Sequence, residues 1–177
     1  MSGLVRPHHG VMPVIAPSVF IAETAVVIGD VQIGADSSVW YGCVLRGDGN
    51  SIRVGERTNI QDGTIIHVNH ERAGAAGTKT TIGSDITIGH MALIHACTLE
   101  DGCFVGMKAC VMDGVVVETG AMVAAGALVT PGKRVKRGEL WAGSPAKLMR
   151  AVSEAELKYF AYSARHYCEM AASYRNG

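Results

Sequence analysis

Three histidines are the residues whose type and spacing could hold a metal ion: His67, His90 and His95. Imidazole is a common zinc ligand in proteins. His90 and His95 lie five residues apart, and neither regular element brings that spacing to one metal. Five residues of helix turn through about 140°, so the two rings diverge. On a strand, an odd spacing places the rings on opposite faces. The element that carries them therefore decides whether they can share an ion.

The chain contains a six-residue repeat. Aliphatic residues recur every six positions from Ile15 to Leu45, and the pattern resumes after two breaks and one single-residue slip as far as Val135. Four residues after each aliphatic comes a small or β-branched residue, and glycine often follows the aliphatic directly. A short strand and a tight turn fit in six residues, and three such units close one triangular coil. The repeat predicts an all-β solenoid, a parallel β-helix of about six coils within residues 1–150.

The last part of the chain has a helical period instead. Ser153 and Glu156 have the spacing of a capping box, which is typical of a helix start. The apolar residues that follow at helical spacing predict one buried face, made of Leu157, Phe160, Ala161, Ala164, Cys168 and Ala171. We therefore expect residues 151–177 to form a helix that packs against the side of the β-helix or against a neighbouring chain.

The register of the repeat places the three histidines relative to one another. His67 and His95 each follow an inward aliphatic residue, Ile66 and Ile94, and these are three hexads apart when the loop ERAGAAGTKT is skipped. Three hexads make one coil, so the two rings should share a column on adjacent rungs, about 4.8 Å apart. His90 belongs to a different face. We predict that it reaches the metal of a neighbouring chain in a ring of three chains.

Composition limits the classes of function. Sixteen basic and sixteen acidic residues give the 177-residue chain a formal net charge of zero, which argues against nucleic acid or an anionic membrane as a partner. No uncharged apolar run reaches the roughly 18 residues of a membrane span, and the N-terminus lacks the layout of a signal peptide. Five cysteines without a CxxC pair suggest reduced thiols in the core of a cytoplasmic protein. His8, His9 and His166 are interpreted as ordinary surface residues.

Four motifs together resemble the gamma-class carbonic anhydrase family: LRGD, NIQDGTIIH, IGHMALIH and AGSPAK. The resemblance covers nearly the whole chain. Hexads and AGSPAK alone also occur in hexapeptide acyltransferases, whereas the combination of Arg-x-Asp, Gln-Asp-x4-His and His-x4-His is more specific. The resemblance implies a left-handed coil, although the general rule for parallel crossovers favours the opposite hand. It also implies a homotrimer with zinc, or iron or cobalt, at each subunit interface.

The resemblance assigns roles to five residues near the metal. His67 and His95 of one subunit and His90 of the next match the metal ligands. Gln61 matches the residue that hydrogen-bonds the metal-bound water. Tyr167 matches a tyrosine that some members direct towards the metal.

The charged residues match the family only in part. Arg46, Asp48 and Asp62 match charges that pair across the subunit interface. The best-studied type has a glutamate just after Arg-x-Asp and another in a long acidic loop, but this chain has Gly49 and, approximately, His70 at those positions, and its loop is short. His70 is a candidate proton shuttle because an imidazole titrates near neutral pH. We expect a slow enzyme.

Three neutral imidazoles leave a fourth position for water, whose pKa a zinc ion lowers to about 7. The expected reaction is the reversible hydration of carbon dioxide. Three alternatives stay open: a metal-dependent acyl-thioester hydrolase, an acyltransferase without a catalytic metal, and a non-catalytic scaffold or metal-binding protein. The three-histidine set argues against the acyltransferase, but the sequence does not separate the hydratase from the hydrolase.

Overall fold

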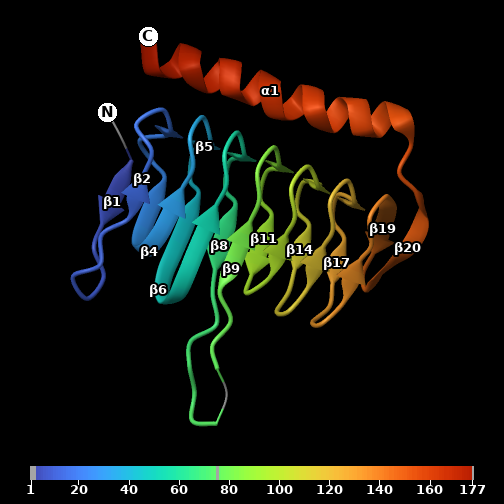
Figure 1. Cartoon of the computed structure of the whole chain (residues 1–177), viewed down its shortest axis with the longest axis horizontal. Coiled ribbons are helices and arrows are strands. Elements are labelled where there is room, and N and C mark those ends of the chain that lie inside the picture. Colours follow the sequence, from blue (N-terminus) through green and yellow to red (C-terminus); the bar gives the residue numbers. More distant parts are fainter. Residues whose placement is uncertain (1–2, 75, 177) are drawn as a thin grey trace.

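The computed structural model describes residues 3–74 and 76–176 and shows a three-sided parallel β-helix with one long helix along its side (Figure 1). The first face contains β1 (Leu4–Arg6), the first halves of β4 (Val26–Ile33) and β6 (Val44–Val54), β8 (Ile65–His67), β11 (Leu93–His95), β14 (Cys110–Val111) and β17 (Leu128–Val129). The second face contains β2 (Val14–Ile15), the second halves of β4 and β6, β9 (Thr80–Ile82), β12 (Thr98–Leu99), β15 (Val116–Val117) and β18 (Arg134–Val135). The third face contains β3 (Phe20–Ile21), β5 (Ser38–Val39), β7 (Asn59–Ile60), β10 (Thr87–Ile88), β13 (Phe104–Val105), β16 (Met122–Val123) and β19 (Glu139–Gly143), followed by the antiparallel β20 (Ala146–Ala151).

Each face carries seven parallel strands or strand halves in the described part of the chain. Strands β4 and β6 bend round a corner and so join the first and second faces into one sheet. The sequence suggested about six coils. The additional coil arises because β1 precedes the first aliphatic of the repeat and β19 follows the last. The predicted fold, a left-handed parallel β-helix of hexapeptide repeats with a C-terminal helix, is confirmed.

The core is the stack of inward side chains that the repeat predicts. Leu45, Ile66 and Ile94 are fully buried aliphatics, and the small second column is buried with them, as at Cys43 and Ala92. These columns bury a continuous apolar ladder, which is the main source of stability in a solenoid. After the single-residue slip, buried Cys97 takes the second-column position in place of Thr98, which is half-buried.

Helix α1 (Glu154–Asn176) packs on the third face and runs back along the β-helix towards its N-terminal end (Figure 1). Its length of 23 residues corresponds to about 34 Å, which matches the roughly 29 Å spanned by seven rungs. The capping box is present: Ser153 N–H donates to Glu156 Oε2 over 2.8 Å, and Glu156 N–H donates to Ser153 Oγ over 3.3 Å. The division of the chain into a β-helix domain, residues 1–150, and a helical unit, residues 151–177, stays a prediction.

The buried face of α1 differs from the predicted one. Phe160, Ala164 and Ala171 are buried as expected, but Leu157 is 43% exposed and Ala161 is exposed. Cys168 is only half-buried. Ser163, a polar residue, lies on the buried face because its hydroxyl has a hydrogen-bond partner, Thr87 Oγ1, on the third face.

Candidate functional site

His67 and His95 face each other on adjacent rungs of the first face. They are in-register partners of the parallel pair β8 and β11, as the hexad count predicted. Both side chains point outward beside the inward Ile66 and Ile94, because strand residues alternate. His67 Nδ1 and His95 Nε2 lie 3.2 Å apart.

The outer nitrogen of each ring contacts a carboxylate. His67 Nε2 lies 3.0 Å from Asp48 Oδ1, and His95 Nδ1 lies 2.6 Å from Asp113 Oδ1. An ionised carboxylate only accepts hydrogen bonds, so each outer nitrogen carries the proton and donates. With both rings neutral, the two inner nitrogens carry no proton, so their lone pairs face and repel each other. A cation between them would remove this repulsion.

The geometry of this pair fits a tetrahedral metal. Two nitrogens bound to one tetrahedral zinc at about 2.0–2.1 Å lie about 3.3 Å apart, close to the 3.2 Å between His67 Nδ1 and His95 Nε2. Metal-bound histidines usually donate their other N–H to a carboxylate or carbonyl, which fixes the ring and its tautomer. Asp48 and Asp113 stand in that position.

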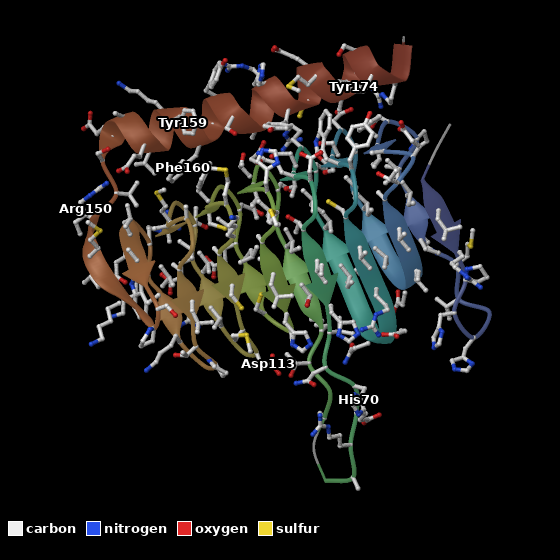
Figure 2. All side chains as sticks on the ribbon, turned by 180° about the vertical axis from the view of Figure 1, so that it is seen from behind. His70, Asp113, Arg150, Tyr159, Phe160 and Tyr174 are labelled. Carbon is white, nitrogen blue, oxygen red and sulfur yellow. The ribbon has the colours of Figure 1, made fainter. Side chains whose placement is uncertain are left out.

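Asp113 was missed by the sequence analysis. It follows His95 by 18 residues, but the single-residue slip shortens this coil to 17 residues, since Ile94 pairs with Val111. The hexad count therefore places Met112 in the histidine column and Asp113 one residue beyond it. Asn69 Nδ2 donates to Asp113 Oδ2 and holds the carboxylate towards His95. Figure 2 shows Asp113 and His70 on the side of the β-helix away from α1, near the loop that projects between β8 and β9.

Asp48 connects the histidine pair to an arginine. Partial burial would raise the pKa of the Asp48 carboxyl, but hydrogen bonds from His67 and Arg46 outweigh burial and lower it to about 2. Arg46 therefore pairs with Asp48 of its own chain. Asp62 lies 2.8 Å from His90 Nδ1, also within the chain. The expected pairing of Arg46, Asp48 and Asp62 across a subunit interface stays a prediction.

The predicted metal ligands and catalytic residues fall into two separate hollows of one chain. His67, His95, His70 and Asp113 line a cleft of about 720 Å³. His90, Gln61 and Tyr167 line a second pocket of about 340 Å³ between α1 and the third face. Within the described residues, no three His, Cys, Asp or Glu side chains are grouped to hold a metal. His90 thus does not join the other two histidines in one chain, as its place on another face predicted.

A buried hydrogen-bond chain orients Gln61. Gln61 Nε2 donates to Asn59 Oδ1 over 3.0 Å, Asn59 Nδ2 donates to Thr87 Oγ1 over 2.9 Å, and Thr87 Oγ1 lies 2.8 Å from Ser163 Oγ of α1. Asn59 Nδ2 also donates to the Ile86 carbonyl over 3.3 Å. Because that carbonyl can only accept, it fixes the direction of the chain. Gln61 is left with its side-chain oxygen, a hydrogen-bond acceptor, for the pocket.

Tyr167 belongs to the same pocket but is held differently. Its ring packs edge-on against Trp40, with the ring centroids 5.5 Å apart. Burial, and secondarily the charge of Asp62, raise the pKa of the Tyr167 hydroxyl. The phenol therefore stays protonated at neutral pH and can donate a hydrogen bond.

Gly49 and His70, the two departures from the best-studied type, are neighbours in space. A Cβ built on Gly49 would lie 2.8 Å from the Cβ of His70, closer than real Cβ atoms come. Glycine at position 49 therefore makes room for His70, which is exposed and lies in a small hollow with His67, Arg46 and Asp48. A residue larger than glycine at position 49 would therefore displace His70.

Cys43, Cys97 and Cys103 are buried core residues, as expected, whereas Cys110 and Cys168 are only half-buried. Burial raises the pKa of the Cys43 thiol to about 11 and that of Cys97 to about 12. Both therefore stay as thiols at neutral pH, which disfavours metal binding and nucleophilic attack.

The first face has an uncovered apolar column beside the histidine pair. Its outward residues stack in register from rung to rung: Leu4, Val26, Val44, Ile65, Leu93, Cys110 and Leu128. Ile65 is 46% exposed and Leu93 is 36% exposed. A contiguous apolar surface of this kind typically marks a contact with another protein.

No family model matches the chain. Sequence comparison finds "Gamma carbonic anhydrase 2, mitochondrial" of Arabidopsis thaliana, which is 53% identical over 159 residues and covers 90% of this chain and 57% of the relative. A protein of Methanocaldococcus jannaschii named "Probable carbonic anhydrase" is 42% identical and covers 88% of this chain and 94% of the relative. The chain belongs to the gamma-class carbonic anhydrase family.

Two further proteins match this gamma-class carbonic anhydrase homologue over nearly the full length of both chains. A solved structure from Anaplasma phagocytophilum, described as a hexapeptide transferase family protein, is 49% identical with a TM-score of 0.90 and covers 97% of this chain and 98% of that one. "Protein YrdA" of Escherichia coli is 40% identical and covers 98% of this chain and 95% of the relative. By contrast, the chain spans less than two thirds of the three Arabidopsis thaliana relatives that it matches.

The structure adds one observation about membranes. Within the described residues, no helix has the length and apolar character needed to cross a bilayer.

Proposed function

We propose that this chain is a metal-dependent enzyme that hydrates carbon dioxide reversibly, with zinc the expected metal and iron or cobalt as alternatives. The observation that carries the proposal is the pair of inner nitrogens of His67 and His95, 3.2 Å apart, each on a ring whose outer nitrogen faces a carboxylate. Such a pair is built to hold a cation. Gamma-class relatives carry the name carbonic anhydrase.

The assembly we propose is a homotrimer with a metal site at each interface. Each chain offers His67 and His95 in one hollow and His90, with Gln61 and Tyr167, in another. A ring of three chains brings the first hollow of one chain to the second hollow of the next. The uncovered column that includes Ile65 and Leu93 is the surface that such a ring would bury.

His67, His95 and the neighbour's His90 would hold the metal, which when bound supplies a water with a pKa of about 7. Asp48 and Asp113 keep the first two rings in the tautomer that leaves the inner nitrogens free. The Gln61 oxygen would accept a hydrogen bond from that water and so orient it.

His70 is the group we propose to move the proton out. It is exposed and lies in the hollow that also contains His67. General acid–base help of this kind is typically worth about a hundredfold or more. One imidazole in place of two carboxylates should leave turnover limited by this transfer, which makes a slow enzyme. The free thiols favour action in the cytoplasm, whereas the plant relatives are named mitochondrial.

The second candidate is a hexapeptide acyltransferase without a catalytic metal, which the description of the Anaplasma phagocytophilum structure favours. The two functions differ in their need for metal and in the number of essential histidines. Metal analysis combined with assays of carbon dioxide hydration and acyl transfer separates them. Turnover that survives complete metal removal, with one essential histidine, would establish the acyltransferase.

Subunit mixing tests the shared site directly. His67→Ala and His90→Ala chains, each inactive alone, should recover metal when unfolded and refolded together, because one interface of every mixed trimer collects all three wild-type ligands. Random mixing in equal amounts should restore about a quarter of the sites. Mixing two His90→Ala preparations is the control and should restore none. No recovery in the mixed sample, despite mixed trimers, would show that each site is built within one chain.

A further inference from the structure

The pocket beside His90 exists because one outward column of the third face loses its side chains. The column runs through Trp40 and Gln61 and continues with Gly89 and Gly106, each following an inward aliphatic on successive rungs. A Cβ on Gly89 or Gly106 would meet backbone atoms at 2.6 or 2.4 Å, so the close rungs require glycine there. The absent side chains leave a hollow under α1 of about 340 Å³.

The hollow is mainly apolar, with a few polar groups in its lining. Phe104, Met107, Met122 and Tyr159 form much of its lining, and the polar groups come from Gln61, Thr87, His90, Ser163 and Tyr167. Its volume equals roughly eleven water molecules at about 30 Å³ each. Carbon dioxide has three atoms and needs only a small part of it. An apolar pocket of this size with convergent polar groups is typical of a small organic ligand.

We propose that this pocket binds a short linear acyl group, of about four to six carbons, with its carbonyl oxygen accepting a hydrogen bond from the Tyr167 hydroxyl and its carbonyl carbon near Gln61 and His90. This inference rests on the proposed function, because the reactive water comes from the same site. In the reaction, the oxygen of water bonds to the acyl carbon and the bond from that carbon to the leaving sulfur or oxygen breaks. The leaving group departs with one proton of the water, and the carboxylic acid releases the other at neutral pH.

The apolar walls determine which acyl groups fit. Each methylene that enters such a pocket gains about fourfold in affinity. Affinity should therefore rise along a series of primary amides from acetamide to hexanamide and stop rising once the pocket is full. These amides carry the carbonyl but no activated leaving group, so they report binding in metal-free protein, measured by calorimetry.

Two substitutions change the length of the pocket in opposite directions. Ala125→Leu adds bulk at its lining, and Met122→Ala removes bulk from its wall. The first should move the best amide to a shorter chain by about two carbons, and the second to a longer one. Ala161→Leu, on the exposed side of α1, adds the same side chain outside the pocket and should leave the series unchanged. Affinity that does not depend on chain length in wild-type protein overturns the inference, since a neighbour's side chain must then fill the hollow.

Activity of the zinc-loaded protein tests the second half of the inference. Para-nitrophenyl esters and acyl thioesters of the same chain lengths distinguish the two classes of leaving group, and the preferred length should shift with Ala125→Leu and Met122→Ala as it does in binding. His67→Ala should abolish this hydrolysis and leave amide binding within twofold, because His67 lies in the other hollow. Length-dependent amide binding without hydrolysis of either class refutes the hydrolase. If zinc-loaded wild-type protein hydrolyses the esters or thioesters with this length preference but does not hydrate carbon dioxide, the proposed function is wrong and the acyl pocket stands.

Discussion

Thr87→Val tests whether α1 positions Gln61. The substitution keeps the β-branched shape but removes the hydroxyl that bridges Asn59 and Ser163. Thr87 and Asn59 are 3% and 1% exposed, so the substitution leaves a buried polar group without its partner. A buried polar group left unpaired costs about 1–3 kcal/mol. For a chain of this size, each kcal/mol of lost stability lowers Tm by about 2–4 °C.

The expected kinetic effect follows from freeing the Gln61 amide. Asn59 keeps its bond to the Ile86 carbonyl, 3.3 Å away, but without Thr87 it is held less firmly, and the acceptor oxygen of Gln61 is no longer fixed towards the site. Losing a neutral hydrogen bond of about 0.5–1.5 kcal/mol lowers kcat/KM about two- to tenfold. Stopped-flow hydration of carbon dioxide, at equal metal content, measures it. Thr87→Ser should restore most of the loss.

A double-mutant cycle decides whether Thr87 acts through Gln61. In a Gln61→Ala background, Thr87→Val should change kcat/KM by less than about twofold, because the group it positions is already absent. Equal losses in both backgrounds would refute this reasoning and leave Thr87 as a purely structural residue. Thermal unfolding of the metal-free variants gives a readout that does not depend on activity.

Three further predictions concern assembly, proton transfer and the helix start. Leu93→Asp, in the uncovered apolar column, should convert the trimer to monomers that bind little metal, as judged by light scattering and metal analysis; wild-type protein that is monomeric at micromolar concentration contradicts the trimer. Imidazole buffer should raise kcat for carbon dioxide hydration severalfold with little effect on kcat/KM, and His70→Ala should increase that dependence; a fast, buffer-independent wild type contradicts rate-limiting proton transfer, and an unchanged buffer dependence in His70→Ala argues against His70 as the shuttle. Glu156→Gln should lower Tm at pH 7, because hydrogen bonds from Arg150 and Ser153 lower the pKa of the Glu156 carboxyl to about 2; this stabilisation is present above the unfolded pKa of about 4.3 and lost as pH falls to about 2, so a Tm difference that persists at pH 2 points to another cause.

The repeat made the fold predictable because one short period fixes many positions at once. Each aliphatic six residues after the last must point inward, so Ile66 and Ile94 define the rungs and their neighbours His67 and His95 must stack. The same count leads to Met112 on the next rung, because Ile94 pairs with Val111, and so it does not identify Asp113. The face of α1 was less predictable, because Ser163 is buried through its contact with Thr87, 76 residues away.

Contacts between different faces of the β-helix, or between two breaks in the repeat, could not be predicted from the sequence either, because the repeat does not relate these segments to one another. The clash that a side chain at Gly49 would make with His70 depends on how two breaks in the repeat meet in space. The direction of the Gln61 amide depends on a backbone carbonyl, Ile86, whose place the hexads do not report. The hollow under α1 depends on the helix that covers it.

The route of α1 also determines how late during synthesis the first coils of the β-helix are covered. The ring of Tyr174 lies 5.5 Å from that of Phe20 and 5.2 Å from that of Trp40, so the end of the helix covers the first coils. About 150 residues separate Phe20 from Tyr174, which at ribosomal speeds of about 5–20 residues per second takes roughly 8–30 seconds. Until then Phe20 and Trp40 in the first coils of the nascent chain lack the ring of Tyr174 that covers them in the finished fold.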